Sequence, residues 1–75
     1  MSVKDFFKTW DFFFTDIEVI DIMIEGHNRE RITFNVHNCW KKIFEEPNHF
    51  ERCIIKSFSI LNNELFILCV DIFSI

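Results

Sequence analysis

The sequence is poor in glycine, proline and basic residues, and each shortage excludes a class of function. Its 75 residues include one glycine and one proline. A phosphate-cradling loop needs several glycines, so Gly26 alone excludes a nucleotide-binding motif of that kind. Lys and Arg number 8 against 12 acidic residues, which gives a net charge of −4. Nucleic-acid binding needs clustered basic side chains, and the one basic pair, Lys41–Lys42, is followed directly by two glutamates. We therefore expect no direct binding to nucleic acid.

Long apolar runs are also missing. The apolar stretch 65–75 has 11 residues, about half of what a bilayer-spanning helix needs. The first apolar stretch is interrupted by Asp5, Lys8 and Asp11 and does not resemble a secretory signal peptide. The odd number of cysteines, three, fits reduced thiols. The sequence thus predicts a cytosolic protein that does not cross a membrane.

Aromatic residues are abundant for a chain of this length. Eleven Phe and two Trp make up 17% of the residues, and 49% are hydrophobic. We expect a single domain, 1–75, and a domain this small buries only about 60% of the surface of its unfolded chain. Either the core is tightly packed with some rings exposed, or apolar surface is shared with a partner.

Two helices are predicted. The first follows Ser2 as its cap and runs for about three turns, with apolar residues spaced three and four apart: Val3, Phe6, Phe7, Trp10, Phe13 and Phe14. Its end is open, because 12–15 also has high strand propensity. The second is a short helix from Asn38 to Glu46, which Asn38 caps and Pro47 stops. Phe50, in the connection that follows, is expected to fill the core.

Two hairpins are predicted from alternating residues. In the first, 16–25 pairs with 31–37 through a turn at 27–29, and a register that sets Glu25 opposite Arg31 gives a favourable charge pair. In the second, 53–61 pairs with 65–72 through a three-residue loop, 62–64, which sets Phe58 opposite Leu68 and gathers apolar residues on one face. The expected fold is α+β: one four-stranded antiparallel sheet with both helices packed on one face.

Metal binding is considered for His37, Cys39, His49 and Cys53. Two imidazoles and two thiols are suitable donors for tetrahedral zinc, but their spacing is not that of a standard zinc finger. Free cysteine also packs as a small hydrophobic residue. We therefore expect no metal and no cofactor, with a zinc-stabilised interaction module as the alternative.

Catalysis is not expected. Cys39 with His37 is the one local pairing of a thiol and a base, and the sequence offers no oxyanion hole to accompany it. The carboxylates along 16–25 alternate like those of a solvated strand. This pattern favours a protein that is not an enzyme.

A protein partner is the interpretation that best fits the surplus apolar surface. The candidate contact residues are carboxylates and aromatic anchors: Asp21, Glu25, Trp40, Glu45, Glu46 and Phe73. Mimicry of nucleic-acid phosphate by the carboxylates is a less favoured interpretation, because proteins that mimic nucleic acid usually carry a far greater negative charge. The alternative is a structural homodimer, because the last strand is apolar and has no Pro or Lys that would protect an exposed edge.

Two segments resemble a known group of proteins. The opening, Val3-Lys-Asp-Phe-Phe-Lys-Thr-Trp10 with Phe14-Thr-Asp-Ile-Glu-Val-Ile-Asp21, is similar to small phage and prophage proteins of low-GC Gram-positive bacteria. The closing hairpin, from Cys53 to Leu68, resembles theirs as well. The resemblance implies an accessory protein that binds and inhibits a host defence complex, such as an anti-CRISPR protein, and it assigns no functional residues. Together with the surplus apolar surface, it suggests steric occlusion of a host nucleic-acid-processing complex.

Overall fold

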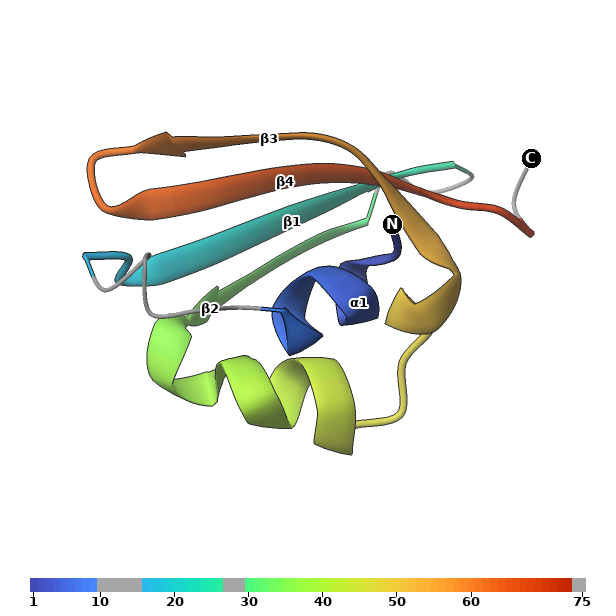
Figure 1. Cartoon of the computed structure of the whole chain (residues 1–75), viewed down its shortest axis with the longest axis horizontal. Helices are drawn as coiled ribbons and strands as arrows, with labels where there is room; N and C mark the ends of the chain where they lie inside the picture. Colours follow the sequence, from blue (N-terminus) through green and yellow to red (C-terminus); the bar gives the residue numbers. More distant parts are fainter. Residues whose placement is uncertain (10–15, 27–29, 74–75) are drawn as a thin grey trace.

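A four-stranded sheet carries the described helices on one of its faces (Figure 1). The structure, a computed structural model, describes residues 1–9, 16–26 and 30–73. Its strands are β1 (Val19–Glu25), β2 (Arg31–Asn35), β3 (Cys53–Leu61) and β4 (Glu64–Asp71). Its helical elements are α1 (Val3–Lys8), η2 (Val36–Asn38), η3 (Lys41–Glu45) and η4 (Phe50–Arg52). The α+β class is therefore confirmed.

The sheet is mixed, so the prediction of a purely antiparallel sheet is wrong. The strand order is β2-β1-β4-β3, and β1 lies parallel to β4 while both hairpins are antiparallel. The reason is the helical connection 36–52, which runs back along one face of the sheet, as a crossover between parallel strands does (Figure 1). The strands β2 and β3 therefore begin at the same end of the sheet. The last strand is central, so it is not the exposed edge that the sequence suggested.

The turn between β3 and β4 has two residues, and the predicted three-residue loop is wrong. Asn62 and Asn63 both have positive φ, 52° and 63°, as the favoured two-residue hairpin turns require. Asn tolerates the left-handed region better than most residues, so two consecutive asparagines can form the turn without glycine. Phe58 consequently pairs with Ile67 and not with Leu68.

The register of β1 and β2 also differs from the prediction. Met23 lies opposite Arg31, and Ile22 lies opposite Ile32. Glu25 is therefore not the cross-strand partner of Arg31. The predicted turn at 27–29 lies outside the described residues.

Side-chain caps begin α1 and η2. Ser2 Oγ accepts a hydrogen bond from the Asp5 N–H at 3.1 Å, which confirms the predicted start of α1. The predicted extension of this helix to 14 lies outside the described residues. The second helical segment starts earlier than predicted, because the side chain of Asn35, and not that of Asn38, caps its first turn.

Asn48 closes the second helical segment. This segment widens into a π-helical turn at Lys41–Glu45, which leaves backbone carbonyls without their usual helical partners. The side-chain amide of Asn48 lies 2.8–3.1 Å from the carbonyls of Lys42, Ile43 and Glu46, to which it donates. These bonds turn the chain toward Phe50, which is 2% exposed and fills the core as predicted.

The core lies between the sheet and the helical elements. Its buried apolar members come from the four strands, from α1, η3 and η4, and from the connection before β1: Val3, Phe7, Ile17, Ile20, Ile22, Ile24, Phe34, Ile43, Phe50, Cys53, Leu65, Ile67 and Cys69. The sheet residues among them alternate with residues that point to the opposite face. That opposite face has no described element packed on it (Figure 1).

Candidate protein-binding surface

The candidate site is the face of the sheet opposite the helices, called here the uncovered face. Buried and half-buried side chains alternate at every position of β4, from Glu64 to Asp71. The half-buried ones point away from the core, as do their register partners on the neighbouring strands. The uncovered face is formed by Asp21, Met23, Glu25, Arg31, Thr33, Ser57, Ser59, Phe66, Leu68 and Val70.

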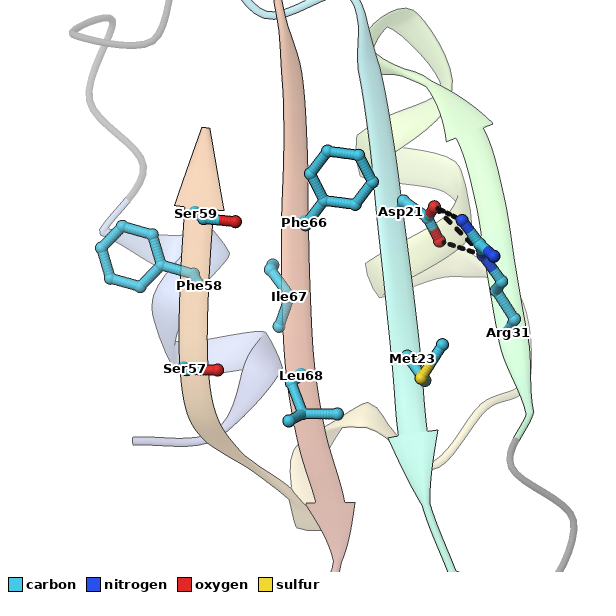
Figure 2. Close-up of a pocket in the computed structure, with 9 residues that line it drawn as sticks. All are labelled: Asp21, Met23, Arg31, Ser57, Phe58, Ser59, Phe66, Ile67 and Leu68. Carbon is cyan, nitrogen blue, oxygen red and sulfur yellow. Dashed lines mark hydrogen bonds and ion pairs between the residues drawn. The ribbon is translucent and has the colours of Figure 1, made fainter. Parts of the chain in front are cut away.

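An open groove of about 470 Å³ lies across this face. Figure 2 shows Phe66 and Leu68 along its middle, on β4, with Met23 beside them on β1. The hydroxyls of Ser57 and Ser59 form one rim. The groove therefore has an apolar centre and a polar border.

The opposite rim is an ion pair. The carboxylate of Asp21 accepts hydrogen bonds from Arg31 Nε at 3.0 and 3.1 Å, and it is also paired with an Arg31 terminal nitrogen. Asp21 is only 5% exposed, whereas the side chain of Arg31 remains 57% exposed. The hydrogen bond to Asp21 raises the pKa of the Arg31 guanidinium. Asp21 thus fixes the orientation of Arg31, which can still donate to a bound partner.

Further charges lie at the two ends of the face. The ammonium of Lys56, at the bulge in β3, lies 2.8 Å from Glu25. At the other end the Glu18 N–H donates to the Asn63 carbonyl at 2.7 Å, which places Glu18 near Glu64. The charges named on this face and its ends are four carboxylates and two basic groups, so acidic charge is in excess.

The candidate contact residues predicted from the sequence lie in separate places. Asp21 and Glu25 belong to the uncovered face. Trp40 lies on the helical side, 65% exposed, with its ring 4.6 Å from that of Phe44. Glu45 and Glu46 end the same helical segment, and Glu46 is paired with a lysine of that segment at 3.4 Å.

Phe73 lies apart from both groups, beyond the end of β4. It is 75% exposed, and the guanidinium of Arg52 lies 5.3 Å from the centre of its ring. No single surface of the described chain therefore unites the six candidates. Sequence reasoning did not identify Met23, Arg31, Phe66 and Leu68 as contacts, although the apolar residues at every position of 65–68 indicated apolar side chains on both faces.

Only half of the candidate metal ligands come together. His49 and Cys53 form a group with Asp71, in which the donor atoms all lie within 4.8 Å of one another. His37 and Cys39 lie in the helical segment and do not join this group. The pairing of Cys53 with Asp71 across β3 and β4 makes the group, and only the sheet register could reveal it.

The three thiols have different environments. Burial raises the pKa of Cys39 to about 11, which keeps this thiol protonated at neutral pH and makes it a poor nucleophile. Cys53 and Cys69 are fully buried side by side. A hydrogen bond between them lowers the pKa of Cys53 and raises that of Cys69.

Comparison with protein-family models, with curated proteins and with solved structures gives no match to this chain. Among the described helices, none has both the length and the apolar character needed to cross a bilayer. The geometry of the molecule itself is therefore the basis for the proposals that follow.

Proposed function

We propose that this chain is a non-enzymatic protein-binding module that docks through its uncovered face and inhibits its partner by steric occlusion. The partner is a protein whose contact surface combines apolar side chains with basic groups. One observation carries the proposal: half-exposed apolar side chains of β4 form a row across a sheet face that no described element covers. An apolar centre with a polar rim is the usual anatomy of a protein interface.

The charge distribution supports a basic partner. Asp21 and Glu25 are balanced by Arg31 and Lys56, so Glu18 and Glu64 supply the excess negative charge at one end of the face. The whole chain also carries a net charge of −4. Complementary charge accelerates association and suppresses binding to acidic proteins, and its effect falls as salt is added.

The resemblance to phage proteins supports a host defence complex, such as a CRISPR nuclease, as the target. Channels that hold nucleic acid are lined with basic side chains, which would attract an acidic module. The domain measures 34 × 24 × 19 Å, which is large enough to fill the mouth of such a channel. Inhibition would then be stoichiometric and would need no chemistry.

The test compares two variants that change the charge equally on opposite sides of the molecule. Leu68→Lys places a positive charge at the centre of the uncovered face, and Trp40→Lys places the same charge on the helical side. Tagged wild-type protein and both variants, each checked for an unchanged fold by circular dichroism, are incubated with lysate of a low-GC Gram-positive bacterium. The readouts are the captured protein, its retention as salt rises, and its nuclease activity.

We expect the wild type and Trp40→Lys to capture the same nuclease and to inhibit it at one equivalent, with retention falling as salt rises. Leu68→Lys should capture none. Capture that survives Leu68→Lys but is lost with Trp40→Lys, or with Glu45→Lys combined with Glu46→Lys, would contradict the proposal. A wild-type mass of two chains at micromolar concentration that Leu68→Lys returns to one chain would show that a second copy occupies the face, which is the homodimer alternative.

A further inference from the structure

At one end of the sheet, three segments far apart in the sequence bring metal-ligating side chains near one another. Cys53 begins β3 and Asp71 ends β4, and the two residues are register partners. His49 precedes them in the turn before η4, and Glu30 lies just before β2. The donors of His49, Cys53 and Asp71 lie within 4.8 Å of one another. This group shares no residue with the uncovered face.

The distances around His49 do not correspond to hydrogen bonds. Its Nε2 atom lies 3.9 Å from the carboxylate of Asp71 and 3.9 Å from that of Glu30. Donors that share a tetrahedral zinc ion lie about 3.3 to 3.7 Å apart, given metal–ligand bonds of about 2.0 to 2.3 Å. The imidazole therefore lies from each carboxylate at nearly the distance that separates two ligands of one ion, and side-chain shifts of about 1 Å would bring in the thiol of Cys53. Glu30 lies outside the group of three and would complete the site only by a further movement of its exposed side chain.

Asp71 is oriented toward this position by its other contacts. Its Oδ1 atom accepts a hydrogen bond from the Phe73 N–H at 2.9 Å, while Oδ2 faces His49. Arg52 Nε lies 3.2 Å from both oxygens. Carboxylate ligands are commonly held by such outer partners, which fix the direction of the free lone pair.

The charges of the group suit a divalent cation. With the ligands deprotonated, Cys53, Asp71 and Glu30 contribute three negative charges and Arg52 contributes one positive charge. The net charge of the group is then −2, which one divalent cation would neutralise. Cys53 and Asp71 are at most 5% exposed, whereas the side chains of His49 and Glu30 are 28% and 51% exposed, so the ion would be held between a dry side and a side open to water.

We propose that His49, Cys53 and Asp71, with Glu30 as the fourth ligand, form a structural zinc site that joins the start of β2 to the start of β3 and the end of β4. The mixed donor set of thiolate, imidazole and carboxylate favours zinc over magnesium or calcium, which prefer oxygen donors alone. This site differs from the expectation of no metal and from the alternative ligand set considered in the sequence, since His37 and Cys39 are exchanged for Asp71 and Glu30. It is independent of the proposed protein-binding function.

The test uses the full chain, freed of metal with a chelator and titrated first with Co²⁺ and then with Zn²⁺. Co²⁺ reports its ligands directly, because a thiolate ligand gives a charge-transfer absorption and tetrahedral geometry gives strong visible bands. We expect one equivalent of Co²⁺ to produce both signals and one equivalent of Zn²⁺ to abolish them. Zinc at a hundredfold excess over its dissociation constant should raise the Tm by roughly 10 to 20 °C.

Variants separate the two candidate ligand sets. His49→Gln retains a half-exposed polar side chain and should fold, and it should weaken binding by more than the roughly 10- to 100-fold that loss of an outer-shell partner costs. The matched control, His37→Gln, should leave affinity unchanged. A folded wild-type chain that binds neither metal at micromolar concentration would overturn the proposal. It would be overturned equally if His37→Gln or Cys39→Ser abolished the cobalt signal while His49→Gln preserved it.

Discussion

The two faces of the sheet are built from alternate residues of the same strands, yet only one of them is covered. On the covered face, Leu65 is fully buried and Ile67 is 2% exposed. On the opposite face, Met23 is 40% exposed, and Leu68 of β4 is only half-buried. Both faces are rich in apolar side chains, so hydrophobicity alone does not determine which face becomes the core.

The difference follows from the amount of helical material. The described helical elements, α1 and the segment from η2 to η4, are short and form a single layer. This layer buries one face along β1 and β4, but Phe58 and Ile60 on the same face of β3 stay 52% and 47% exposed. The apolar residues of the other face stay partly in contact with water. The comparison teaches that the helical layer leaves an apolar row on the second face of this small sheet only partly buried.

The largest expected effect on stability comes from replacing a leucine by alanine on each of the two faces of β4. Leu65→Ala should lower the free energy of unfolding by about 2–5 kcal/mol, because it leaves a cavity in a closed core. Leu68→Ala should cost less than half as much, because Leu68 is partly hydrated before and after the change. Urea unfolding followed by tryptophan fluorescence measures both.

The free energy lost by Leu65→Ala approaches the total free energy of unfolding of a small domain. Leu65→Val removes less of the side chain and provides a milder version of the same test. Equal losses for the two alanine variants would break the comparison. That result would mean that Leu68 is buried in solution.

A smaller difference is expected between the Tm shifts caused by breaking each of the two ion pairs of the uncovered face. Asp21 is nearly buried and holds Arg31 and Thr33, so Asp21→Asn removes a charge from several hydrogen bonds and should lower the Tm by several degrees. Glu25 and Lys56 are both about half exposed, so Glu25→Gln should shift the Tm by about 1 °C or less. Thermal unfolding by circular dichroism distinguishes them. Similar shifts for both variants would show that Asp21 is as hydrated as Glu25.

The smallest effect concerns reactivity rather than stability, and it probes the covered side. With a pKa of about 11, Cys39 is almost entirely protonated at pH 8. Its alkylation by iodoacetamide should therefore be roughly 10- to 100-fold slower than that of a free cysteine peptide, and should accelerate as the pH rises toward 11. Peptide mass spectrometry gives the rate for this residue, and unfolding in urea should restore it. A native rate equal to the peptide's would show that the helical layer leaves Cys39 open to water.

Part of the candidate site could be read from the sequence. Asp21 and Glu25 were expected to contact a partner, and both lie on the uncovered face. Their ion-pair partners were not predicted correctly, because the register of β1 and β2 differs by two residues from the one that the charge pattern favoured. Trp40, Glu45 and Glu46 lie in the predicted helix 38–46, so the sequence placed them on the helical side, away from Asp21 and Glu25.

The sequence by itself determined the elements. Periodicity of two along β1 to β4, the cap at Ser2 and the stop at Pro47 act within a few residues, so each could be recognised locally. Only the tertiary structure decided the sheet order, the parallel pairing of β1 with β4 and the face that the helices cover. The strand order, the pairing and the covered face depend on contacts between distant segments. Because both faces of the sheet carry apolar residues, the sequence does not favour one face over the other as the side that the helices cover. The convergence of His49, Cys53 and Asp71 was decided in the same way, because a register that spans the sheet brings them together.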